Sequence, residues 1–201
     1  MADIWPQIVT AWQAQSILEV VAVFTGIIYL LLAIKENIWC WFFAIISTGV
    51  SVYLFFDVEL LSESLLYLYY FIMAFYGFYQ WKFGDNHHER RIISWHIKKH
   101  LMWIAVTGAM VPVLGYTTSQ WGAAMPYLDA FTTCFAIFST VLVAYKVLEN
   151  WHYWLIVNTI SVYLYASKEL YLYAAMSALY VVLTVTGMIK WRQSYANQLA
   201  K

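Results

Sequence analysis

The sequence predicts an all-helical integral membrane protein with seven transmembrane helices, arranged as two parallel three-helix repeats around one linking helix (3+1+3). Three observations support this fold class. Hydrophobic residues make up 63% of the 201 residues and charged residues only 11%, against about 25% charged in soluble domains. The apolar residues fall into seven runs, most of them near the roughly 20 residues that a membrane-spanning helix needs. The second half of the chain also resembles the first at a constant offset of 110 residues.

Short charged or turn-rich stretches separate the seven apolar runs, and each run predicts one helix. The expected helices cover about 17–34, 38–56, 63–81, 100–116, 127–145, 151–166 and 170–190. The breaks between them are Lys35 to Asn37, Asp57 to Glu59, Lys82 to Lys99, Thr117 to Gly122, Glu149-Asn150 and Ser167 to Glu169. The 11 basic and 11 acidic residues balance, so no charge excess points to nucleic acid as a partner.

The N-terminal segment, residues 1–16, precedes the first expected span. Its Ile4, Ile8 and Trp12 recur every four positions, as in a short amphipathic helix on the membrane surface. A frayed tail fits the same residues. The segment has no basic start and no small-residue cleavage site, so we expect no signal peptide.

The internal repeat appears when the sequence is aligned with itself without gaps. The matches include Trp41 with Trp151, Ser51–Leu54 with Ser161–Leu164, Gly77 with Gly187, and Trp81-Lys82 with Trp191-Arg192. Three helices would leave the second copy inverted, but the run at 100–116 supplies a fourth crossing and makes the copies parallel. The predicted organisation is a first repeat at 17–82, a cytoplasmic loop and linker helix at 83–126, a second repeat at 127–192, and a tail at 193–201.

The basic residues predict the orientation, because lysine and arginine favour cytoplasmic loops. With the N-terminus outside, ten of the 11 lysines and arginines face the cytoplasm, and only Lys168 lies outside. The C-terminus is then cytoplasmic.

The sixth run carries the first candidates for a substrate site. Trp151, Trp154 and Asn158 are spaced i, i+3 and i+7, so they project from one helical face. Asn158 lies about 12 Å from the helix start at 1.5 Å per residue, near the middle of the bilayer. An indole could stack on a flat, cationic heterocycle while the amide reads a polar group. Alternatively, Trp151 anchors the helix at the interface and Asn158 only bonds a neighbouring helix.

The repeat adds further candidates. The first-half counterparts are Trp41, Ala44 and Thr48, which would give a pocket with one large and one small wall. Tyr70 and Tyr180 are also equivalent, and they either line the path or serve in packing. Glu19 and Asp129 are equivalent acids near the outer ends of their helices, where they either mark a substrate or proton path or complement the helix dipole.

These residues resemble a known family. Trp151-x-x-Trp154-x-x-x-Asn158, Lys35-x-Asn37-x-x-Cys40-Trp41 and the stretch Tyr76 to Trp81 are similar to motifs of the PnuC family of bacterial vitamin transporters. The resemblance implies a SWEET-like fold in the bacterial inner membrane, a vitamin-like nucleoside such as nicotinamide riboside as the cargo, and a homotrimer. It further implies facilitated diffusion, with a cytoplasmic kinase that traps the product. Thiamine or riboflavin is the alternative cargo.

Other function classes find less support in the sequence. No Gly-rich phosphate loop, Walker lysine motif or nucleophile elbow is present, so we expect no nucleotide cofactor. The histidines His87, His88, His96 and His100 fit a solvated loop better than a metal site. An integral-membrane enzyme or a receptor-like protein remains as an alternative to a transporter.

Overall fold

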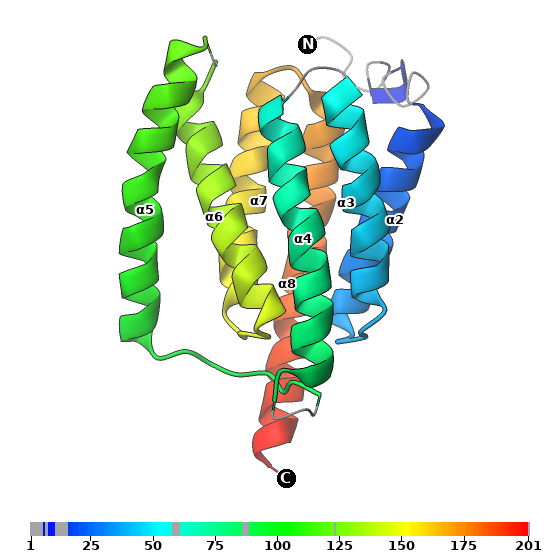
Figure 1. The fold of residues 1–201 in the computed structure, drawn as a ribbon, viewed down its shortest axis with the longest axis vertical. Coiled ribbons are helices and arrows are strands. Elements are labelled where there is room, and N and C mark those ends of the chain that lie inside the picture. Colours follow the sequence, from blue (N-terminus) through cyan, green and yellow to red (C-terminus); the bar gives the residue numbers. More distant parts are fainter. Residues whose placement is uncertain are drawn as a thin grey trace.

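The computed structural model describes residues 6, 8–10, 16–57, 61–85, 89–122 and 124–200. The helices α2 to α8, whose bounds the structure gives, run nearly parallel or antiparallel to one another (Figure 1). They are α2 (Ile17–Ile34), α3 (Cys40–Asp57), α4 (Leu61–Phe83), α5 (Ile97–Gln120), α6 (Pro126–Ala144), α7 (Asn150–Ser167) and α8 (Tyr171–Leu199).

The observed helices match the seven expected runs to within a few residues at most ends. The largest difference is at α8, which continues to Leu199 through the segment expected as a tail. The linker helix α5 is also longer than its apolar run, because it starts at Ile97 and ends at Gln120. Of the N-terminal segment, Pro6 and residues 8–10 are described, as helix. Most of the predicted surface helix therefore lies outside the described residues.

The turns after α2 and α6 share an unusual backbone conformation. The turn after α2 places Glu36 at φ 55°, and the turn after α6 places Lys146 at φ 49°. Few residues other than glycine adopt a positive φ, yet these two positions are 110 residues apart, as in the sequence repeat. Moreover, α3 and α7 begin and end at positions that differ by the same offset. The repeat therefore extends to the backbone of the turns.

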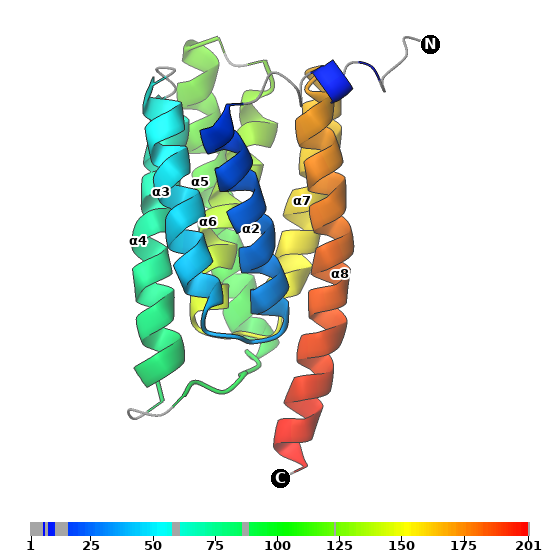
Figure 2. The same cartoon turned by 90° about the vertical axis from the view of Figure 1, so that its right-hand side faces the viewer.

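The helices form two three-helix bundles and one peripheral helix. In the first bundle α3 packs against both α2 and α4, and in the second α7 packs against both α6 and α8. The bundles meet where α4 packs on α6 and where α2 packs on α8, two contacts that the repeat makes equivalent (Figure 2). Helix α5 lies outside this core and packs on α6 (Figure 1).

Five helices, α2, α3, α5, α6 and α8, are long and apolar enough to cross a membrane. The remaining two, α4 and α7, do not meet that standard by composition, although both lie within the bundles alongside the other five. Both are rich in tyrosine and tryptophan, and α7 also contains Asn158. The two less apolar helices are thus among those that carry the candidate site residues.

The connection between α4 and α5 forms hydrogen bonds with the turn after α6, in the second bundle. Ile93 forms a parallel bridge with Val147, through hydrogen bonds from Ile93 N to Lys146 O (3.0 Å) and from Leu148 N to Ile93 O (2.8 Å). Arg90 Nε also donates to Tyr145 O at 3.1 Å. This connection, the two turns after α2 and α6, and the end of α8 all lie at one end of the molecule (Figure 1). We call it the C-terminal end.

Candidate substrate site between the two bundles

Four tryptophans form a layer that joins the two bundles near the C-terminal end. Trp41 meets Trp81 edge to face at 5.4 Å between ring centroids, and the equivalent pair Trp151 and Trp191 meets at the same 5.4 Å. Trp81 and Trp191 then contact each other across the bundles at 6.0 Å. All four side chains are buried. We call these four residues the aromatic floor.

Two equivalent glycines allow the aromatic floor to pack. A Cβ atom added to Gly77 would lie 2.2 Å from the Trp41 ring, and one added to Gly187 would lie 2.4 Å from the Trp151 ring. These distances are far inside van der Waals contact, so each indole ring lies directly against glycine backbone. Packing of the tryptophan rings therefore explains why both halves have a glycine at this position, seven residues after Tyr70 and seven after Tyr180.

The aromatic floor also carries hydrogen bonds between the bundles. Trp81 Nε1 donates to Val143 O at 3.0 Å, and Trp191 Nε1 donates to Ala33 O at 3.0 Å. Both donors and both acceptors are repeat equivalents, so each bundle makes the same bond to the other. In contrast, Trp41 Nε1 and Trp151 Nε1 are buried without a hydrogen-bond partner. Such donors are uncommon in folded proteins, and here they form a matched pair.

A polar pair lies about two helical turns from the aromatic floor, toward the middle of the helices, because Asn158 follows Trp151 by seven residues and Thr184 precedes Trp191 by seven. Asn158 Nδ2 donates to Thr184 Oγ1 of α8 at 3.2 Å, and both side chains are buried. Thr48, the counterpart of Asn158, instead donates to Ala44 O of its own helix at 2.7 Å. The second bundle thus has an interhelical polar contact where the first has an intrahelical one.

Trp154 is the predicted site tryptophan that stays partly exposed. It packs against both clusters of buried apolar residues, one around the aromatic floor and one between α6 and α7. Trp41 and Trp151, in contrast, are each only 2% exposed. Trp151 is therefore a core residue in this structure, covered by neighbouring helices. Of the three predicted tryptophans, Trp154 is the one whose side chain keeps an exposed surface.

Tyr70 and Tyr180 lie one further helical turn from the aromatic floor. Tyr70 of α4 packs against the buried cluster of α6 and α7, in the opposite bundle. Tyr180 of α8 faces α2, because a Cβ added to Gly26 would lie 3.7 Å from its hydroxyl oxygen. Each tyrosine thus reaches across to the other bundle.

The two equivalent acids are engaged locally and lie away from this layer. Glu19 forms a capping box with Ser16 at the start of α2. Asp129 accepts a hydrogen bond from Lys168 Nζ at 2.8 Å, within the second bundle. Both acids lie in the first turn of a helix, where negative charge complements the helix dipole. The alternative reading of these acids as helix-terminal charges therefore has direct structural support.

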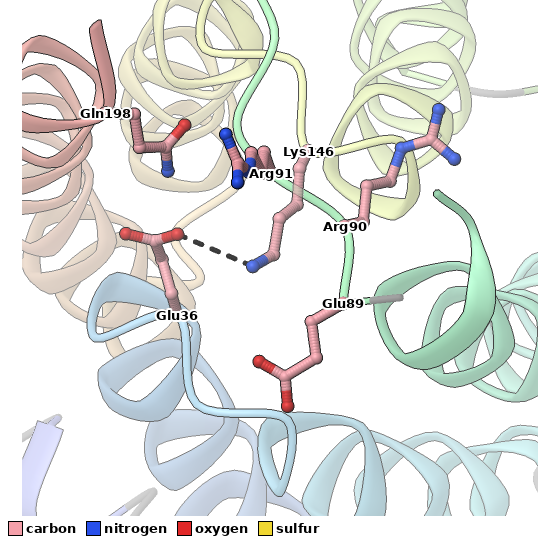
Figure 3. Close-up of a pocket in the computed structure, with 6 residues that line it drawn as sticks. All are labelled: Glu36, Glu89, Arg90, Arg91, Lys146 and Gln198. Carbon is pink, nitrogen blue, oxygen red and sulfur yellow. Dashed lines mark hydrogen bonds and ion pairs between the residues drawn. The ribbon is translucent and has the colours of Figure 1, made fainter. Parts of the chain in front are cut away.

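A charged cavity of about 380 Å³ opens at the C-terminal end, beyond the aromatic floor. Lys146 Nζ lies 3.4 Å from Glu36 Oε2 and 4.5 Å from the centroid of the Trp81 ring. Glu36 belongs to the first bundle and Lys146 to the second, and the two are repeat equivalents. Figure 3 shows the lysine amine between the Glu36 and Glu89 carboxylates, while the Arg90 guanidinium points away.

Burial lowers the pKa of the Lys146 amine, and the neighbouring Glu36 carboxylate opposes that shift. The lysine is only 7% exposed, and the nearby carboxylates of Glu36 and Glu89 favour its charged form. We call the Glu36–Lys146 ion pair the latch.

Reasoning from the sequence missed Thr184, the latch and the floor contacts of Trp81 and Trp191. The repeat alignment did single out Trp81 and Trp191, because these two tryptophans match each other in it. Glu36 and Lys146 are also 110 residues apart, but their charges are opposite and so they do not match by identity. Thr184 aligns with Ala74, and no pattern distinguishes it from other threonines in the apolar runs.

Comparisons with known proteins agree with this architecture. A sequence profile described as "Nicotinamide mononucleotide transporter" matches residues 16–193. The nicotinamide riboside transporter PnuC of Escherichia coli (strain K12) is 29% identical over 85% of this chain and 82% of its own length. PnuC of Neisseria mucosa is 26% identical over 92% of this chain and 75% of its own. A solved structure described as the crystal structure of the vitamin B3 transporter PnuC superposes with a TM-score of 0.73, at 25% identity, over 95% of this chain and 87% of that one.

Proposed function

Because the chain belongs to the nicotinamide mononucleotide transporter family, which its match over residues 16–193 shows, we propose that it carries nicotinamide riboside across a bacterial membrane. It is a multi-pass membrane protein and not an enzyme. The main support for nicotinamide riboside as the cargo is that the named relatives agree with the residues found between the bundles. In that site, a partly exposed indole and an amide lie about one turn apart on α7.

The proposed membrane arrangement has all seven helices α2 to α8 crossing the bilayer, as a SWEET-like 3+1+3 fold with the C-terminal end in the cytoplasm. The equivalent contacts α4–α6 and α2–α8 support two parallel repeats, with α5 as the linker. The basic turns and connections at the C-terminal end support its cytoplasmic position. In this arrangement α4 and α7 cross in spite of their polar residues, because neighbouring helices bury Ser64 of α4 and Asn158 of α7.

The proposed binding mode places the flat cationic ring of the cargo on Trp154. Cation–π attraction there contributes about 1–2 kcal/mol when water is excluded. Asn158 bonds a polar group of the cargo, while Thr48, Tyr70 and Tyr180 line the remaining walls. Trp41 and Trp151 support the site from beneath as part of the aromatic floor. The two bundles then alternate access by rocking about this layer.

The proposed energetics are facilitated diffusion, with trapping of the product by a cytoplasmic kinase. Support comes from Glu19 and Asp129, which are both engaged at helix ends and not beside Asn158, where tight coupling to an ion would need them. A homotrimer is part of the same proposal and rests on the family resemblance. Thiamine or riboflavin remains the second candidate cargo, since each also offers a flat heterocycle to Trp154.

A calorimetric panel of the purified protein tests the cargo directly. We expect nicotinamide riboside to bind more tightly than thiamine, riboflavin and unrelated nucleosides. Trp154→Ala and Asn158→Ala should each weaken that binding at least tenfold, which corresponds to about 1.4 kcal/mol. Thr186→Val, on the exposed face of α8, serves as the control with unchanged affinity. Equal affinities in both site variants and the control would put the site elsewhere.

A further inference from the structure

The two interfaces between the bundles, α4–α6 and α2–α8, occupy equivalent places in the repeat but differ in their hydrogen bonds. Along α4–α6, Tyr69 Oη donates to Ile137 O at 3.0 Å midway along the helices. Trp81 Nε1 donates to Val143 O at 3.0 Å in the aromatic floor. The α4–α6 interface is therefore bonded at two separate levels by these side chains.

A cluster of polar side chains bonds the same two helices at the C-terminal end. The hydroxyls of Tyr76 on α4 and Tyr145 at the end of α6 bond to each other. Gln80 Nε2 donates to the Tyr76 hydroxyl at 2.9 Å, and Arg90 Nη1 donates to Gln80 Oε1 at 2.5 Å. Arg90 Nε donates in turn to Tyr145 O at 3.1 Å. We call Tyr76, Gln80, Arg90 and Tyr145 the polar cluster; it joins α4, α6 and the connection that follows α4 (Figure 1).

The equivalent interface between α2 and α8 keeps the bond of the aromatic floor and lacks the others. Trp191 Nε1 donates to Ala33 O at 3.0 Å, and within the described ranges this is the only side-chain hydrogen bond between the two helices. The counterparts of Tyr69 and of the polar cluster are Leu179, Thr186, Lys190, Ala200 and Lys35. Thr186 donates to a carbonyl of its own helix. Lys35 and Lys190 are exposed.

We propose that α4–α6 is a hinge that stays closed while the two bundles rock, and that the C-terminal end opens by parting α2 from α8. Parting α4 from α6 would break three side-chain hydrogen bonds and the attachment of Arg90. Parting α2 from α8 breaks one such bond, besides the latch. A buried donor or acceptor that loses its partner is costly, so the less bonded interface opens first. This inference rests on the proposed function, in which the bundles move as rigid bodies.

The test links each interface covalently at repeat-equivalent positions and measures uptake by proteoliposomes. In a chain whose native cysteines are replaced by alanine, Gln80→Cys with Tyr145→Cys joins α4 to the end of α6. The matched pair, Lys190→Cys with Lys35→Cys, joins α8 to the end of α2. A short bifunctional methanethiosulfonate reagent closes each pair, and mass spectrometry of the intact protein confirms the link. Each variant is compared with itself before linking.

We expect the α4–α6 link to leave uptake of nicotinamide riboside nearly unchanged, because the hinge stays closed throughout transport. The α2–α8 link should lower uptake about tenfold or more, because it blocks the rocking motion, and a reducing agent should restore it. A second α4–α6 pair avoids the polar cluster: Tyr69→Cys with Ile137→Cys joins positions that already bond, and its link should also preserve uptake.

Loss of uptake on linking either α4–α6 pair would overturn the hinge, and so would continued uptake after the α2–α8 pair is linked. Absence of uptake in the unlinked wild type is a different outcome. It would overturn the proposed function itself, together with the hinge that rests on it.

Discussion

At the scale of single residues, the face Trp151, Trp154 and Asn158 follows from helical spacing, but the roles within it differ. Spacing shows that three side chains share a face; it cannot show which of them a neighbouring helix covers. Because Gly187 has no side chain, the Trp151 ring can pack in the core, whereas Trp154 stays partly exposed. That distinction depends on α8, which lies next to α7 only after folding. The substrate-binding roles of all the candidates stay predictions.

The glycine contacts give a prediction about stability. Gly187→Ala would place a methyl group 2.4 Å from the Trp151 ring, and overpacking of this kind typically costs about 1–3 kcal/mol. The matched control is Gly108→Ala in α5, where an added Cβ meets nothing within 4 Å. Thermal unfolding in detergent should show a lower Tm for Gly187→Ala and an equal or higher Tm for Gly108→Ala. Equal Tm values in the two variants would contradict the described packing of the aromatic floor.

At the scale of elements, the sequence predicted each of the helices α2 to α8 from its apolar run, and the repeat predicted that α3 and α7 correspond. Helix ends were less predictable where polar residues extend a helix beyond the apolar run, as at α5 and α8. The latch between the bundles was not predictable, because it joins residues of opposite charge from two separate turns. It lies at the C-terminal end, so we infer that it closes that end in this structure.

The latch gives a prediction about opening. Glu36→Gln leaves the buried Lys146 charge without its partner, and loss of one partner of a buried pair is destabilising. The double variant Glu36→Gln with Lys146→Met should recover that stability while the bundles stay uncoupled. Native Cys40, which is fully buried at the start of α3, can report opening when Cys134 is replaced. Its alkylation should be faster in the double variant than in wild type.

The matched control for the latch is the pair Asp129 and Lys168, which lies within the second bundle. Asp129→Asn with Lys168→Met removes an ion pair without uncoupling the bundles. It should leave the alkylation rate of Cys40 unchanged. Equal rates in both double variants would show that the latch does not hold the C-terminal end closed.

At the scale of the whole molecule, the two ends of α5 test the orientation. Lys98 and Gln120 are exposed near opposite ends of this helix. In a chain without its native cysteines, Gln120→Cys should react with an impermeant reagent in intact cells, and Lys98→Cys only after the membrane is opened. The opposite pattern would invert the proposed topology. Charge bias in the sequence gives this expectation, since the fold alone is compatible with either orientation.

The central claim is that this chain alone moves nicotinamide riboside down its gradient, and uptake by protein-only proteoliposomes tests it most directly. We expect saturable uptake without ATP or an imposed ion gradient, which stops when internal and external concentrations are equal. Trp154→Ala should slow uptake, and an inward proton gradient should leave the plateau unchanged. Accumulation above the external concentration under that gradient, abolished by Glu19→Gln or Asp129→Asn, would contradict facilitated diffusion and assign these acids to proton coupling.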